Sequence, residues 1–403
     1  MLKQIFNRFL RPRHYWRDLG FDELSELYTS MMFRSLAQSL VGIFIPIYLY
    51  QLDYAVWQIL FFYAIAFSAH TLATYPVAQL IAKIGPKHTI LTSYVFQVMG
   101  MLMLVSQPDL RWPLVAIATV MGVSGCLFFT AFHVDFSKVK HSEHGGKEVG
   151  WMYSMERVGA VVGPLVGGLV GYFVGPQYIF MVAIILLFVG IIPLFITSEV
   201  VAINQKLNFR NLNLRDIRFD LVSQGFFHVE NAISIIIWPL FVGIYVFQDN
   251  PYIQLGSITS LSVLVSLFAA RAIGRTIDKR KGRQLLRLGV GLNAGLHLFR
   301  PFTTGYTGAL GINLLNEVVT PAYRMTYIKG VYDAADVLTG RRIVYITAME
   351  TVASISRAAF FMFAGVVAYA FQDSRAIFVS FFLVAALASL GIMLERYKAL
   401  NTA

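Results

Sequence analysis

Apolar residues fill the chain in long uninterrupted stretches, and this pattern predicts helices that cross a membrane. Each stretch is close to the roughly 20 residues that a helix needs to span a bilayer. Twelve spans are predicted, at residues 27–50, 56–82, 89–106, 112–136, 149–174, 178–198, 219–247, 253–274, 285–304, 306–330, 343–371 and 375–395. The expected fold class is therefore an all-α integral membrane protein.

Composition and charge agree with this picture. The mean hydropathy is +0.63 and 14% of residues are charged, whereas about 25% of the residues in soluble domains are charged. The net charge of +11 could indicate a nucleic-acid partner, but the basic residues gather in every second loop. They include Lys83, Lys87, Lys138, Lys147, Arg210, Arg215, Arg275, Arg287, Arg341, Arg342 and Arg396. The positive-inside rule then predicts that both termini lie in the cytoplasm, and the expected location is the cytoplasmic (inner) membrane. Anionic lipids are the expected partners of the basic loops, and no nucleic acid is expected.

Two segments recur with nearly the same offset. IFIPIYLYQL from Ile43 resembles IIWPLFVGIY from Ile236, and YSMERVGAVV from Tyr153 resembles TAMETVASIS from Thr347. Six spans followed by six in the same orientation is the parallel-repeat plan of many transporters. The predicted organisation starts with an amphipathic cytoplasmic segment (1–26) and a six-helix bundle (27–198). A cytoplasmic linker (199–218), a second six-helix bundle (219–395) and a cytoplasmic tail (396–403) follow.

With these repeats, the chain resembles the major facilitator superfamily over nearly its whole length. The loop GRTIDKRKGRQ places Gly274, Asp278, Gly282 and Arg283 much as the family places a glycine, aspartate, glycine and basic loop. The resemblance implies a cytoplasmic gate there. The matching loop of the first half, AQLIAKIGPKH, keeps Gly85 and Lys87 but has Ala82 where the family has aspartate.

The fifth span contains GAVVGPLVGG, which resembles a signature of the drug/proton antiporters of this family. Gly159, Gly163, Pro164, Gly167 and Gly168 occupy its fixed positions. Small residues let membrane helices approach closely, and proline permits a bend. We interpret the segment as a smooth ridge at the moving interface between the halves; ordinary small-residue packing is the alternative.

Polar residues within the spans are the candidate site, because ionisable groups are costly in lipid. The resemblance implies a cavity lined by the first, fourth, seventh and tenth helices. We expect substrate or proton-coupling roles for Arg34, Gln38, Glu230, Asn231, Asn313 and Glu317. Arg34 is the expected partner of the two carboxylates, or else a site for an anionic group.

Two further glutamates, Glu156 and Glu350, stand at equivalent places in the fifth and eleventh spans. Their repetition favours a structural, pseudo-symmetric gate pair over a substrate site.

These features predict a secondary active transporter that works by alternating access, with proton-coupled efflux of a small amphipathic or hydrophobic compound. A proton-coupled importer, a lipid or lysolipid flippase and a non-transporting sensor are the alternatives. An enzyme is not expected, since HExxH, GxSxG and GxxxxGK[ST] are absent from the sequence. Cys126 is the single cysteine, so neither an intrachain disulfide nor a cysteine metal cluster is expected. The protein is expected to carry no metal and no cofactor and to be a monomer.

Overall fold

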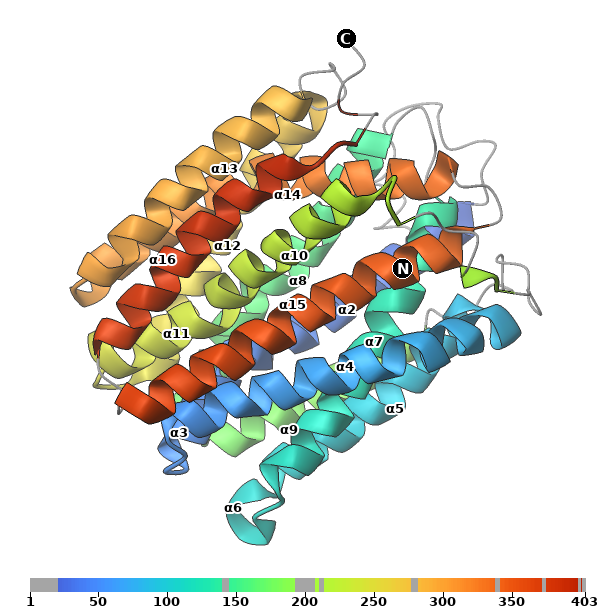
Figure 1. The fold of residues 1–403 in the computed structure, drawn as a ribbon. Helices are drawn as coiled ribbons and strands as arrows, with labels where there is room; N and C mark the ends of the chain where they lie inside the picture. Colours follow the sequence, from blue (N-terminus) through green and yellow to red (C-terminus); the bar gives the residue numbers. More distant parts are fainter. Residues whose placement is uncertain are drawn as a thin grey trace.

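The described residues of the computed structural model, 21–139, 145–192, 207–209, 214–276, 282–337, 341–371, 375–397 and 400, form helices and no strand. The first half contains the six predicted spans in order (Figure 1). Its helices are α2 (Phe21–Gly42), α3 (Ile45–Gln51), α4 (Val56–Ile84), α5 (Pro86–Val105), the short α6 (Gln107–Leu110), α7 (Leu114–Val139), α8 (Gly145–Phe173) and α9 (Pro176–Ile191). The first span is thus made of two consecutive helices.

The second half repeats this order. Its helices are α10 (Arg218–Ala232), η4 (Ile233–Ile237), α11 (Trp238–Phe241), η5 (Val242–Val246), α12 (Pro251–Thr276), α13 (Gly282–Phe299), η7 (Arg300–Phe302), α14 (Gly305–Val337), α15 (Arg342–Phe371), α16 (Arg375–Gly391) and η8 (Ile392–Leu394). The seventh span therefore runs from α10 to η5. Its two π-helical stretches flank α11, which contains Pro239, a residue that removes one backbone hydrogen bond.

Eight segments of the described chain are each long and apolar enough to cross a membrane. They are Thr29–Gln51, Val56–Ile84, Pro86–Val105, Leu114–Phe136, Arg218–Val246, Pro251–Ala269, Arg342–Phe371 and Arg375–Leu394. The shorter α9 is also apolar. Each of the twelve predicted spans overlaps a helix in the described part of the chain, although the sixth extends beyond it, and the predicted all-α membrane fold of two six-helix repeats is confirmed.

Two helix pairs make the most extensive contacts between the halves. α8 packs against α12, and α4 packs against α15. Because α4 and α12 occupy the same place in the two repeats, as α8 and α15 do, these contacts are related by the internal pseudo-symmetry. We call the end of the bundle where α4 ends and α15 begins the basic end, since the basic loops lie there, and the other the opposite end.

The glycines of α8 face two different neighbours. Gly159, Gly163 and Gly167 contact the backbone of α2, near Leu36 and Leu40, with no room for a side chain. Since α2 belongs to the same half, the interpretation of these three glycines as a ridge between the halves was wrong. Their small size instead allows two helices of one bundle to pack closely.

Pro164 and Gly168 do lie between the halves. Gly168 faces the backbone of Tyr252 on α12, and Gly256 of α12 faces the carbonyl oxygen of Pro164. The Leu165 amide donates to Ser260 Oγ at 2.9 Å. Backbone atoms therefore form much of this contact.

The loop signatures are placed only in part. Gly85, between α4 and α5, has φ 87°, a conformation that glycine adopts without strain. Lys87 is buried, and Gly274 lies within α12. Gly282 begins α13; beside it, Arg283 donates to both carboxylate oxygens of Glu395, at 3.1 and 3.0 Å. The loop's aspartate, at position 278, lies outside the described residues.

Candidate functional site

A cavity of about 580 Å³ lies between the two halves. Its walls come from α2, α4, α7 and α8 of the first half and α10, α12, α14 and α15 of the second. Aromatic side chains line much of it, among them Phe62, Tyr63, Phe67, Phe128, Phe129, Phe132, Trp238, Tyr323, Tyr327 and Tyr332. A mainly apolar wall with few polar groups is typical of sites for small organic molecules.

The halves touch at both ends of this cavity. At the opposite end, the hydroxyl of Tyr252 donates to Gln51 Oε1 at 2.8 Å. At the basic end, His133 Nδ1 lies 2.6 Å from the hydroxyl oxygen of Tyr332, whose ring is 5.0 Å from that of Phe136. The cavity is therefore bounded by contacts between the halves on either side.

Two ion pairs connect α8 to α14 across the cavity. Arg157 Nη1 lies 2.8 Å from Glu317 Oε2, and Arg324 Nη2 lies 3.4 Å from Glu156 Oε1. All four residues line the cavity. Glu317 thus has a cationic partner in the other half, but the partner is Arg157, and the expected pairing with Arg34 was wrong.

Arg34 has different surroundings. It is 2% exposed, and its guanidinium carbon lies 3.5 Å from the ring centroid of Phe128 and 5.4 Å from that of Tyr94. Its Nη1 is buried and has no hydrogen-bond partner among the described residues. Because Arg34 lines the cavity, a buried cation with an unused donor faces the space where a solute would bind.

Glu230 is not among the residues that line the cavity. Its carboxylate is enclosed in the second half, where it accepts hydrogen bonds from Ser234 Oγ at 2.8 Å, Asn293 Nδ2 at 2.9 Å and the Tyr323 hydroxyl at 3.0 Å. It also lies 3.0 Å from His297 Nε2, which carries a charge only when protonated. The expected pairing of Glu230 with Arg34 was therefore wrong as well.

The sequence analysis missed Asn293, His297 and Arg300. Arg300 donates to Ser234 Oγ at 3.1 Å and to Asn316 Oδ1 at 2.9 Å. The three residues follow one another at i, i+4 and i+7 spacing, which places them on one helix face. This polar stripe is visible in GLNAGLHLFR, but it lies outside the four helices that the resemblance implies as the cavity lining.

The remaining candidates lie in the cavity wall. Gln38 and Asn231 line it from α2 and α10. Asn313 also lines it and accepts a hydrogen bond from Trp238 Nε1 at 2.7 Å. Within the described part of the chain, no group of three or more His, Cys, Asp or Glu side chains could hold a metal ion.

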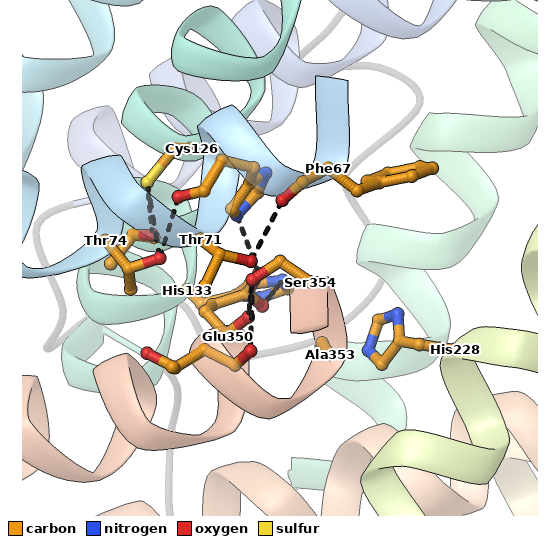
Figure 2. A network of polar contacts seen from close by, with 12 residues as sticks. Phe67, Thr71, Thr74, Cys126, His133, His228, Glu350, Ala353 and Ser354 are labelled. Atoms are coloured by element: carbon orange, nitrogen blue, oxygen red, sulfur yellow. Dashed lines mark hydrogen bonds and ion pairs between the residues drawn. The ribbon is translucent and has the colours of Figure 1, made fainter. Parts of the chain in front are cut away.

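Glu350 of α15 contacts two histidines of the first half. Its carboxylate oxygens lie 3.6 Å from His70 Nε2 and 3.5 Å from His133 Nε2, and Figure 2 shows His133 beside it. Glu156 and Glu350 therefore both reach across to the other half. Their partners differ in chemistry, since Glu156 meets a guanidinium and Glu350 meets imidazoles.

Comparisons with known proteins agree with this architecture. A model of the Major Facilitator Superfamily matches residues 27–319, and no curated protein matches the sequence. Among solved structures, the human organic anion transporter MFSD10 (TETRAN) has a TM-score of 0.68 at 13% identity, with 93% of this chain and 99% of that chain covered.

Two further solved structures are similar to a comparable degree. The E. coli fucose:proton symporter FucP has a TM-score of 0.64 at 13% identity, covering 92% of this chain and 96% of that one. A bacterial homologue of the iron transporter ferroportin, in an outward-facing state, also has a TM-score of 0.64 at 13% identity, covering 92% and 98%. At such identities the likeness concerns the fold alone.

Proposed function

This chain belongs to the Major Facilitator Superfamily, and on that premise we propose that it is a secondary active transporter that exports a small organic solute in exchange for protons. Membership makes it a multi-pass membrane transporter of small molecules. The observation that carries the proposal is the cavity between the halves, because ion pairs from both halves cross it. Alternating access requires such a site, one that can be exposed to either side by parting one set of contacts.

The proposed solute is amphipathic and carries a negatively charged group. Arg34 supplies a buried cation with an unused donor, and the ring of Phe128 extends an apolar surface beside it. A carboxylate on the solute would accept a charge-assisted hydrogen bond from the guanidinium, while its apolar part would pack on the aromatic wall. Gln38, Asn231 and Asn313 are then polar groups that orient it.

Arg157 and Glu317 are proposed to act as a charge gate. A solute carboxylate competes with Glu317 for Arg157, and this competition weakens the contact between α8 and α14. Glu230 is proposed to hold Arg300 in place through Ser234 and His297, so its effect on the cavity is indirect.

Export is supported by the antiporter-like signature of α8, of which Pro164 and Gly168 lie at the contact with α12. Placement in the cytoplasmic membrane, with both termini in the cytoplasm and anionic lipid around the basic end, follows from the charge distribution. On this orientation the basic end faces the cytoplasm. A monomer suffices, because both halves of the cavity come from one chain.

The experiment first uses thermal shift on the purified protein with benzoate, octanoate and the uncharged control benzamide. A ligand at 100 times its Kd stabilises a protein by about 2.7 kcal/mol, so the two acids should raise the unfolding temperature and benzamide should not.

The better acid is then followed in proteoliposomes with an imposed pH gradient. Exchange for protons predicts uptake when the lumen is acidic. Uptake only when the outside is acidic would indicate an importer, and equal behaviour with and without protein would contradict transport of this class of solute.

A further inference from the structure

Glu350 and its two histidine partners form a cluster that joins the two halves, and only His133 is partly exposed. Glu350 is 4% exposed and His70 is 3% exposed. Both lie in the cavity wall together with His133. The carboxylate comes from the second half on α15, and the imidazoles come from the first half on α4 and α7. Separation of the halves at this level must therefore part the carboxylate from at least one imidazole.

The members of the cluster follow one another along the direction of the helices. His70 lies in the middle of α4, and Glu350 lies in the third turn of α15 from the basic end. His133 and its partner Tyr332 lie within the last two turns of α7 and α14. The contacts thus lead from the centre of the cavity towards the basic end, where Tyr332 and Phe136 close it.

The chemistry of the partners sets this cluster apart from the other carboxylates that reach between the halves. Glu156 and Glu317 meet guanidinium groups, and arginine stays protonated in proteins. An imidazole, unlike a guanidinium, can both bind and release a proton. A proton can consequently be shared between Glu350 and an imidazole, whereas a guanidinium that is already protonated cannot accept one from Glu156 or Glu317.

We propose that Glu350, His70 and His133 form the proton-binding site of this transporter, and that a proton bound there parts the halves at the basic end. The inference rests on the proposed function for its biological role, and it goes further by assigning the site. Neither Glu230 nor Glu317, the carboxylates expected from sequence, holds this position.

The direction of the effect follows from the charges. With an ionised carboxylate, Glu350 attracts the two imidazoles, whose Nε2 atoms lie 3.6 and 3.5 Å from its oxygens. A buried carboxylate that loses its partners costs several kcal/mol, so the halves stay together. Once the carboxylate carries the proton, as Oε–H, its charge and most of this attraction are lost. His133 and Tyr332 can then move away, and the proton is released to water at the basic end.

Other charged and titratable groups also face the cluster. They are His228 of α10, Cys126 of α7, Glu156 of α8, Arg324 and Tyr332 of α14, and Arg357 of α15. His228 lies apart from Glu350 in Figure 2, with no contact drawn between them. Arg324 and Arg357 favour the ionised carboxylate. Glu350 is therefore expected to bind a proton only when the cluster faces an acidic compartment.

The test measures the distance between the halves at the basic end as a function of pH. Spin labels are attached to cysteines replacing Lys83 of α4 and Val337 of α14, both exposed, in a Cys126→Ala background. Lowering the pH should shift the population towards longer distances. Glu350→Gln, which imitates the protonated carboxyl, should give the longer distances at every pH. The matched control is Glu156→Gln, which alters the pseudo-symmetric carboxylate and should keep the pH dependence.

The inference is overturned if Glu350→Gln responds to pH as the unmodified protein does. If that variant is not recovered folded, the double variant His70→Gln with His133→Gln removes the proton-exchanging partners and should also lose the response; a retained response would again overturn it. Transport is measured in parallel. A protein that moves no organic acid yet shows the Glu350-dependent response contradicts only the proposed function, and coupled transport that survives Glu350→Gln contradicts only the proton site.

Discussion

Arg34 shows how one buried side chain can bias the choice of solute. Its guanidinium lies against the rings of Phe128 and Tyr94, and cation–π contacts stabilise a cation without neutralising it. The charge therefore remains available to a ligand. Arg157, by contrast, is already paired with Glu317.

We predict that Arg34→Gln weakens binding of benzoate or octanoate by about 10- to 100-fold, since a hydrogen bond to a charged group contributes roughly 1.5–3 kcal/mol. Arg34→Lys should retain part of the affinity, because the charge stays while the planar fork is lost. Thermal-shift titration measures both.

Arg324→Gln serves as the control for Arg34, since it removes a cavity arginine that is already paired with Glu156. It should alter benzoate affinity less than Arg34→Gln does. Equal affinities for Arg34→Gln and the unmodified protein would place the anionic group elsewhere.

Sequence patterns found residues of the cavity but not their partners. The stripes on α2 and α14 correctly place Arg34, Gln38, Asn313 and Glu317 in the wall. Which cation meets Glu317 depends on how α8 packs on α14, and helical periodicity carries no information on that. The stripe of Asn293, His297 and Arg300 did not indicate a site, because Asn293 and His297 lie inside one bundle and only Arg300 of the three lines the cavity.

The helix α8 shows, for a whole element, that spacing along the sequence does not reveal which neighbour a surface contacts. A regular spacing of glycines predicted one contact surface. In three dimensions the segment has two, because Gly159, Gly163 and Gly167 face α2 while Pro164 and Gly168 face α12. The twelve spans themselves were predictable, since length and hydropathy alone determine them.

We predict different consequences for substitutions on these two contact surfaces. Gly163→Leu inserts a side chain between α8 and α2 within one half, and overpacking costs about 1–3 kcal/mol or more, so it should lower the unfolding temperature. Gly256→Leu acts between the halves, so it should change the populations of the spin-label distances while the first half stays folded. A Gly291→Leu control, where an added Cβ meets nothing within 4 Å, should change neither.

These substitutions separate packing from movement. If Gly163→Leu keeps its stability but alters the label distances, the division of α8 into an internal and an external surface is incorrect.

At the scale of the whole molecule, charge couples the two bundles. α8 presents Glu156 and Arg157, and α14 presents Glu317 and Arg324, so each helix offers one carboxylate and one guanidinium to the other. This reciprocal arrangement favours one register between the halves, because sliding α8 along α14 would set like charges against each other.

We predict that Arg157 and Glu317 are energetically coupled. Arg157→Gln and Glu317→Gln should each shift the label populations towards separated halves, and the double variant should shift them by less than the sum. Contacting residues usually give coupling energies of about 0.5–3 kcal/mol, which the four population ratios measure. Strictly additive effects would show that the ion pair does not hold the halves together.

The position of the backbone contact between α8 and α12 also determines how far each end of α8 moves when the halves rotate. Gly168 lies near the opposite end of α8, which runs from Gly145 to Phe173. At 1.5 Å per residue, one arm of the helix beyond this point is about 35 Å long and the other about 8 Å. A rotation of roughly 10° about such a fulcrum would move the basic end by about 6 Å and the opposite end by only about 1 Å. We therefore expect the cavity to open widely at the basic end and narrowly at the opposite end. As solutes become larger, the opposite end should be the first to exclude them.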